Sequence, residues 1–263
     1  MDKKIKLIFD NQTVTIEAGE LVGYIVDSHE FIHQKGSPGW RNSDTEMFPI
    51  IGPTDQENFR VQTPKGSAIQ DQHGLLRELE YEVDKQTETR AIFVKRYKAD
   101  TLVLNSKFPK KSTEEKLSWP YDFEFTKIIE LTNEGLKISF VIAGERDMPF
   151  MLGYHPAFKL ISDNTTIQAN DKQISIEAIL AVGSRALHVP NCKKIVLSDS
   201  QSMEISTTGF SDFMLWTEVS NMVCIEPITF YPYAVAQENL HKGFTSLDNG
   251  KKEFTVFLKP LHN

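Results

Sequence analysis

The 263-residue sequence has too few cysteines and too few long apolar runs for several large classes of protein. Its two cysteines, Cys192 and Cys224, cannot form a disulfide scaffold, and we expect both to be reduced thiols. No apolar run approaches the roughly 20 residues that span a bilayer. The first run ends at Asp10, which is too short for the core of a signal peptide. We therefore expect a cytoplasmic protein with no membrane partner.

Positively charged residues are fewer than negatively charged ones. Lys and Arg total 29 against 36 Asp and Glu, which gives a formal net charge of -7. This balance offers no electrostatic support for a nucleic-acid or anionic-membrane partner. The rest of the composition is ordinary, with 40% hydrophobic and 25% charged residues. It excludes a disordered chain, a collagen and a coiled coil.

Motifs of metal and nucleotide chemistry are missing as well. The histidines show no HExxH pattern, and there is no CxxC pair. His29 and His33 are four residues apart, but their segment reads as a strand end and a loop. No G-x-S-x-G elbow, Walker A loop or G-x-G-x-x-G fingerprint occurs. The sequence therefore predicts no metal site, and serine hydrolase, P-loop and Rossmann functions have no motif.

What the chain does contain is apolar residues at every second position, from one end to the other. The alternation is clearest at Ile5–Phe9, Tyr121–Phe125, Leu136–Ile142 and Phe254–Leu258. This period is typical of half-buried antiparallel strands. No long stretch keeps a helical period, and no linker divides the chain. We predict one all-β domain over residues 1–263, a large sandwich or barrel-like fold.

The most polar connection is 107–119, KFPKKSTEEKLSW. Its charges of both signs are more typical of a solvated loop than of a binding patch. We expect such a loop, with a helical turn near 112–116.

Three short segments carry side chains suited to catalysis. In the first, His73 precedes a glycine, and Arg77 adds hydrogen-bond donors. In the second, His155 precedes a proline, which favours an extended backbone; histidine suits proton transfer near neutral pH. In the third, Glu226 follows an apolar strand, and burial would make it a stronger base. Taken singly, each residue also has a structural explanation: a surface histidine, a core histidine, and a glutamate paired with a buried arginine.

Taken together, the segments QHGLLR, WPYDFEF, LGYHPAF and CIEP, in this order, resemble the galactose mutarotase-like (aldose 1-epimerase) superfamily. The LacX-type branch is the most similar, and hexose-6-phosphate 1-epimerases are related. The resemblance spans nearly the whole chain and implies a large antiparallel β supersandwich. It implies interconversion of the α and β anomers of a free sugar, without a metal or organic cofactor. The implied partner is a small sugar, and we expect a monomer or homodimer.

The resemblance also implies roles for particular residues. Glu226 would take the proton from the C1 hydroxyl, and His155 would protonate the ring oxygen. His73 would bind near these oxygens, and Arg77 would orient the site. Trp216 matches a family tryptophan that we expect in the core.

Two aromatic residues near the motifs are further candidates. The faces of a pyranose ring carry C–H groups, so Trp40 and Tyr154 are candidates for stacking on the sugar.

Two departures from the family pattern bear on sugar recognition. The family's arginine after MFPIIG is replaced by Pro53, and Arg41 and Arg60 are candidate substitutes. The segment GSRALHVPNCKKIV lacks the family's acidic residue, and the next acid is Asp199. Two alternatives therefore stay open beside a mutarotase: a hexose-6-phosphate 1-epimerase, and a non-catalytic carbohydrate-binding or regulatory protein.

Overall fold

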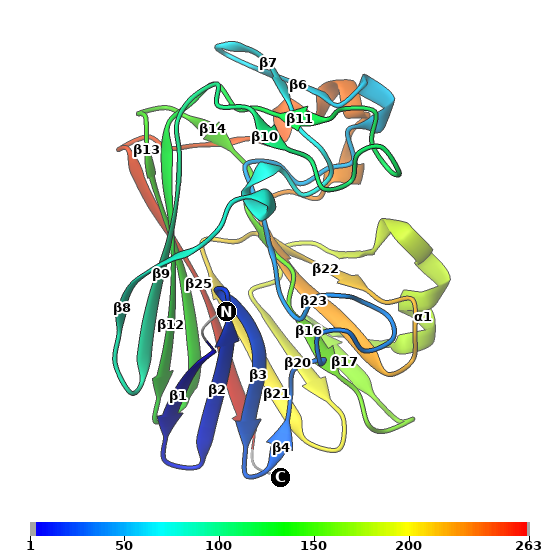
Figure 1. The fold of residues 1–263 in the computed structure, drawn as a ribbon. Coiled ribbons are helices and arrows are strands. Elements are labelled where there is room, and N and C mark those ends of the chain that lie inside the picture. The colour runs from blue at the N-terminus through cyan, green and yellow to red at the C-terminus, as the bar shows by residue number, and fades with distance from the viewer. Residues whose placement is uncertain (1–3, 262–263) are drawn as a thin grey trace.

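The computed structural model describes residues 4–261, and strands dominate it (Figure 1). Every strand pair found among residues 4–261 is antiparallel. Only α1 (Ile176–Val182) is an α-helix among the described residues, and the Ser175 side chain caps its first turn by accepting from the amide of Ala178. The predicted all-β fold is thus confirmed. No helix of residues 4–261 is both long and apolar enough to cross a membrane.

The largest sheet has nine strands and runs from β8 at the left of Figure 1 to β17 and its neighbour at the right. Its centre is a long hairpin whose turn is Asn133–Glu134, between the paired residues Thr132 and Gly135. In sheet order the strands are β18 (Lys172–Ser175), β17 (Thr166–Ala169), β20 (Lys194–Ser198), β21 (Ser202–Thr208), β25 (Lys251–Leu261), β13 (Gly135–Gly144), β12 (Phe123–Thr132), β9 (Arg90–Tyr97) and β8 (Glu82–Gln86).

A second sheet packs against the first and positions the HP and EP segments of the sequence. Phe140 of the large sheet and Tyr154 of the second have ring centroids 5.0 Å apart, so the two sheets share a core. Its strands, in order, are β19 (Leu187–Val189), β22 (Asp212–Trp216), β23 (Met222–Ile228), β15 (Gly153–Tyr154) and β5 (Glu46–Met47), with β16 (Ala157–Lys159) also on β23.

The N-terminal strands form a four-stranded sheet, drawn in blue in Figure 1: β1 (Ile5–Phe9), β2 (Gln12–Glu17), β3 (Glu20–Val26) and β4 (His29–Glu30). Short pairs lie at the top of that view: β6 (Arg60–Thr63) with β7 (Gly66–Ile69), β10 (Val103–Leu104) with β11 (Lys116–Leu117), and β14 (Pro149–Phe150) with β24 (Thr245–Ser246). The 3-10 helices are η1 (Asp55–Glu57), η2 (Leu75–Glu78), η3 (Gly183–Arg185), η4 (Pro232–Ala234) and η5 (Gln237–Gly243).

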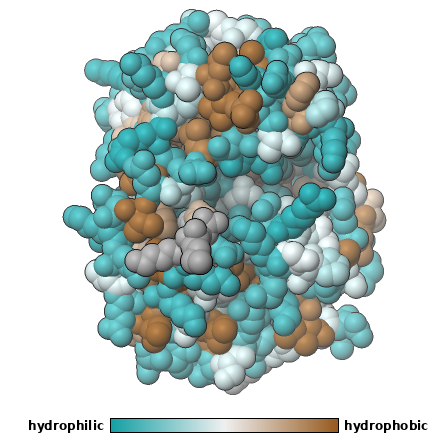
Figure 2. Space-filling view, viewed as in Figure 1, coloured by the Kyte–Doolittle hydropathy of each residue, from teal (hydrophilic) through white to brown (hydrophobic). Residues whose placement is uncertain are grey.

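The alternation in the sequence places the core correctly. Leu136, Ile138, Phe140 and Ile142 of β13 are all fully buried. Phe9 is an exception, since it ends β1 and is 37% exposed. The face shown in Figure 2 is mostly hydrophilic, with apolar side chains in separate groups, as expected where the buried half of each strand faces inward.

The expected helical turn near 112–116 does not form. This segment is an irregular connection that leads into β11. Asn105 stabilises its open shape, because its amide donates to the carbonyl of Glu114 and its backbone N–H donates to that of Glu115.

Candidate active site

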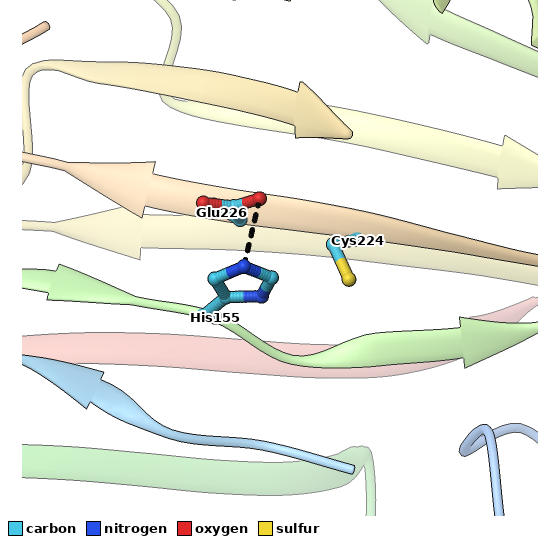
Figure 3. Close-up of side chains that lie close together, drawn as sticks. All are labelled: His155, Cys224 and Glu226. Atoms are coloured by element: carbon cyan, nitrogen blue, oxygen red, sulfur yellow. Dashed lines mark ion pairs between the residues drawn. The ribbon is translucent and has the colours of Figure 1, made fainter. Parts of the chain in front are cut away.

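His155 and Glu226 face each other because of strand register. Gly153 pairs with Ile228 and Ala157 pairs with Cys224, so the residue midway between them, His155, falls opposite Glu226. The His155 amide donates to the carbonyl of Thr45 at 2.8 Å, which fixes the backbone between β15 and β16. As a result, Nε2 of His155 lies 3.4 Å from Oε1 of Glu226 (Figure 3). Both side chains are more than nine-tenths buried.

Aromatic rings surround the His155 imidazole. Trp40 stacks on one face of it, with ring centroids 4.2 Å apart and an interplanar angle of 20°. Trp216 and His73 approach with their rings nearly perpendicular to it, at centroid distances of 5.9 Å and 5.6 Å. These contacts leave the imidazole little freedom to rotate. The structure thus brings His73, His155 and Glu226 together, although they are distant in sequence.

His73 reaches this position through an unusual backbone turn. Both His73 and Gly74 have positive φ, at 74° and 72°. Glycine is required at the second position, because a Cβ there would meet the carbonyl oxygen of Phe48 at 2.2 Å. The Phe48 amide in turn donates to the His73 carbonyl at 3.1 Å. The HG pair therefore forms a backbone turn that holds the His73 ring against His155.

Arg77 and Lys107 provide positive charge beside the histidines. Arg77 lies in η2, and Nη1 donates to the carbonyl of Gln72 at 3.4 Å. Lys107 contradicts the expectation of a wholly solvated loop: it is largely buried, and its Nζ lies 2.7 Å from Oδ1 of Asp71. The positive charges of Arg77 and Lys107 add to burial in lowering the pKa of His73.

Burial shifts the pKa values of the central pair in opposite directions. It raises the pKa of Glu226 well above its usual value, because a buried carboxylate loses hydration. It lowers the pKa of His155 to about 3, and the charge of Arg77 contributes in the same direction. The free site therefore favours a neutral imidazole beside a protonated carboxyl, a pair that holds one proton between two groups.

The Tyr154 side chain points away from the His155 side chain. Neighbouring residues of an extended chain point to opposite faces, and Tyr154 is fully buried on the face that packs against the large sheet. Its hydroxyl donates to Oδ2 of Asp44 at 2.7 Å. Its burial and this hydrogen bond argue against Tyr154 as a stacking surface for the sugar. Trp216 packs against the core and is half-buried, with its ring beside that of His155.

The positions that depart from the family pattern are now placed. Pro53 follows Gly52, which packs against the Cα of Gln72 next to the His73 turn. Of the two candidate substitutes, Arg60 is bound to Glu114 at 3.2 Å, whereas Arg41 is exposed and directly follows Trp40. Asp199 caps the loop 161–165 and is not part of the His155 cluster, since it accepts from the amides of Ile161 and Ser162.

Sequence reasoning missed a polar group farther along the same sheet. His188 pairs with Met214, and Met214 pairs with Glu226, so the three residues form one row on one face. Nε2 of His188 lies 2.8 Å from Oδ2 of Asp212. The ring of Tyr231 stacks on that of His188 with centroids 4.2 Å apart. The only sequence signal was the alternation of LHV and DFMLW, whose pairing partners the sequence does not reveal.

Three potential metal ligands meet on the face of the sheet that carries Glu226. One ligand atom each from His155, Cys224 and Glu226 lie within 4.8 Å of one another, and all three residues are buried (Figure 3). Cys224 and Glu226 are two apart on β23, so they point to the same face. Sequence spacing could not show this cluster, because the third member comes from another strand.

A family model described as aldose 1-epimerase matches residues 59–195, just over half of the chain. The chain belongs to the aldose 1-epimerase family. The matched region includes His73, Arg77 and His155, whereas Glu226 lies beyond its end. For this aldose 1-epimerase family member, Glu226 is therefore placed by its geometry opposite His155.

Individual relatives of this epimerase family member are distant. It is 23% identical over 159 residues to protein LacX, plasmid, of Lactococcus lactis subsp. lactis, a match that covers 56% of this chain and 48% of the relative. The match thus spans about half the length of that curated relative.

Solved structures resemble the fold over nearly its full length. A galactose mutarotase-like protein from Lactobacillus casei ATCC 334 superposes with a TM-score of 0.80 at 16% identity, covering 98% of this chain and all of that one. A galactose mutarotase related enzyme from Lactobacillus acidophilus gives a TM-score of 0.74 at 18% identity, covering 99% and 98% of the two chains. At these identities the likeness shows the fold, and the galactose mutarotase-like architecture predicted from the sequence is confirmed.

Proposed function

We propose that this protein interconverts the α and β anomers of a free aldose, with Glu226 and His155 as the proton-transfer pair. The observation that carries the proposal is the 3.4 Å separation of Nε2 and Oε1 in a largely buried site. The C1 hydroxyl and the ring oxygen of a pyranose are bonded to the same carbon. A base and an acid must therefore act at adjacent points, which this pair provides.

The reaction follows from the movement of two protons. The Glu226 carboxylate takes the proton of the C1 hydroxyl while the protonated His155 gives its proton to the ring oxygen. The bond between C1 and the ring oxygen breaks, and the open-chain aldehyde forms. Rotation about C1–C2 turns the other face of the carbonyl to the ring oxygen, and the reverse transfers close the ring as the other anomer. The pair ends each cycle with the proton count it began with.

The site's electrostatics support this sequence. In the open-chain state the pair consists of a protonated Glu226 and a neutral His155, the uncharged forms that burial favours. Burial thus favours the protonation states of the open-chain intermediate over the ionised pair that starts the reaction.

Recognition of the remaining hydroxyls falls to groups on either side of the pair. His73 and Arg77 lie on the His155 side, and His188 with Asp212 lies on the β22–β19 side of Glu226. Paired Asp and His side chains offer both acceptors and donors to sugar hydroxyls. The partly exposed Trp40 and Tyr231 offer ring faces for the C–H faces of the sugar. In this proposal His188 and Asp212 serve where the segment 183–196 lacks an acidic residue.

The deciding experiment is polarimetry of freshly dissolved α-glucose and α-galactose, with and without protein at catalytic concentration. The proposal expects faster mutarotation of at least one aldose and no net consumption of sugar. The same assay with a hexose 6-phosphate tests the phosphorylated substrate. Sugar binding without acceleration of any aldose would instead assign the protein to carbohydrate binding.

A further inference from the structure

We propose that His155, Cys224 and Glu226 form a zinc-binding site, and that a bound Zn²⁺ switches off the proton-transfer pair. Zinc binding does not depend on the proposed function. The inhibition rests on it, because what zinc would inhibit is the proposed mutarotation. The three residues offer an imidazole nitrogen, a sulfur and a carboxylate oxygen, which are the ligand types that zinc prefers.

The spacing of the ligand atoms fits a zinc ion. Bonds of about 2.0–2.3 Å in a tetrahedral site place neighbouring ligand atoms roughly 3.3–3.8 Å apart. Nε2 of His155 and Oε1 of Glu226 are already 3.4 Å apart. All three ligand atoms lie within 4.8 Å of one another, so a shift of about one ångström at the remaining edges completes the geometry.

Nε2 of His155 can serve as the ligand while Nδ1 carries the ring proton. Nδ1 is buried and has no hydrogen-bond partner among residues 4–261, so no contact there requires the other tautomer. Trp40 covers a face of the ring, but a metal binds in the plane of the ring and is not blocked by that contact. Figure 3 shows Cys224 extending from β23 on the same side as Glu226, toward the space beside His155.

Burial favours a chelate of this kind. Cys224 is fully buried, and Glu226 and His155 are 2% and 6% exposed. Replacing their scarce hydration with three metal bonds costs little further desolvation. The apolar neighbours Ala157 and Met222 also hold Cys224 in place, so its side chain is partly preorganised. The fourth zinc position would be left to water.

Zinc binding would abolish proton transfer by occupying both groups. The lone pair of His155 and the carboxylate of Glu226 would be bonded to the metal, so neither could exchange a proton with the sugar. The displaced protons, including that of the Cys224 thiol, pass to solvent. Harder cations such as Mg²⁺ prefer all-oxygen sites and should have no such effect.

Direct binding is measured first, without any sugar. The chelator-treated full chain is titrated with Zn²⁺ by calorimetry, and with Co²⁺, whose thiolate complexes have a characteristic charge-transfer absorption. We expect one metal per chain and a thiolate signal. Cys224→Ala should weaken binding by at least about 100-fold, since even the supporting partners of metal ligands are worth 10–100-fold. Cys192→Ala is the matched control, because this buried thiol donates to the Lys194 carbonyl outside the cluster.

Inhibition is measured second, on any aldose that the protein accelerates. Zn²⁺ should suppress mutarotation by the wild type and by Cys192→Ala, and chelator should restore it. Cys224→Ala should keep its activity and lose the sensitivity. Equal zinc binding by wild type and Cys224→Ala, or a Co²⁺ complex without thiolate absorption, would overturn the proposal. A thiolate-bearing complex in a protein that accelerates no aldose would uphold the metal site and reject the mutarotase function alone.

Discussion

Glu226 of β23 and His155, between β15 and β16, lie opposite each other with 3.4 Å between Oε1 and Nε2. The same register also aligns Met214 and His188 with Glu226 across β22 and β19. A cross-strand row of this kind gives each side chain a fixed place on one face of the sheet.

Glu226→Gln should abolish mutarotation while leaving the fold intact. The amide keeps the size of the carboxyl group and can hydrogen-bond, but it cannot accept the C1 proton. General-base catalysis typically contributes 10²–10⁴-fold, so we expect a loss of about that size in kcat. Polarimetry gives the rate, and circular dichroism checks the fold. Glu134→Gln, in the exposed β12–β13 turn, is the control. A near-wild-type rate in Glu226→Gln would show that another group is the base.

The two histidines should differ in how their loss affects kinetics. His155→Asn removes the acid that protonates the ring oxygen, so kcat should fall by about 10²–10⁴-fold. His73→Asn removes a group that contacts the His155 ring edge, and we expect a smaller fall in kcat with a larger rise in KM. Initial rates over a range of sugar concentrations separate the two effects. If His73→Asn lowers kcat as far as His155→Asn does, His73 acts in the chemical step as well and is more than a positioning group.

Much of this fold and part of the site could be predicted from sequence. Alternation locates strands because burial on one face imposes a period of two, and the HG, HP and EP segments mark three site residues. Strand pairing is not written in the local pattern, so His188 with Asp212 and the Cys224 cluster were missed. One missed feature did leave a signal. In β12, Lys127 occupies the apolar phase of the alternation Phe123, Phe125, Lys127, Ile129, Leu131, and it is fully buried.

Lys95 likewise occupies a buried position of the alternation in β9, in phase with Ala91, Phe93 and Tyr97. Both lysines lie beneath the second sheet, at a cavity of about 680 Å³ that is also lined by Thr45 and Arg77. A charged residue in the buried phase of a strand is costly unless it is paired, so it indicates an internal polar network. The partners of Lys127 are Asp44 and Glu46, which flank Thr45 in the chain.

Lys127→Met should strongly destabilise the protein. Nζ lies 2.6 Å from Oδ2 of Asp44 and 2.7 Å from Oε1 of Glu46, and all three side chains are at least 95% buried. Removing the cation leaves two carboxylates buried without it, a change that typically costs about 3–5 kcal/mol. Urea unfolding measures the free energy of unfolding. Lys85→Met, at an exposed position of β8, is the control and should change stability by less than about 0.5 kcal/mol. Equal stability of the two variants would mean that the ion cluster contributes nothing net.

Lys95 should make the protein more stable as the pH rises above neutrality. Burial lowers the pKa of Lys95 to about 8, although the nearby Glu46 carboxylate opposes that shift. In the unfolded chain a lysine has a pKa of about 10.4. Between these values the unfolded chain holds a proton that the folded chain has released, so the free energy of unfolding increases with pH. Below pH 8 both states are protonated, and this contribution to the slope vanishes.

The measurement is the difference in unfolding free energy between wild type and Lys95→Met at several values from pH 7 to 9.5. We expect wild type to gain about 1–2 kcal/mol on the variant over the upper part of this range, from the limiting slope of 1.36 kcal/mol per pH unit. The range stops below pH 10, because burial also raises the pKa of Tyr154, and ionisation of that tyrosine in the unfolded chain would then lower stability. Lys6→Met, on the exposed side of β1, is the control for the loss of a lysine outside the buried cluster. A pH-independent difference for Lys95→Met would show that Lys95 keeps its proton in the folded protein throughout this range. Its hydrogen bond to the Leu76 carbonyl and its contact with the Tyr81 ring would then have to stabilise the charged form.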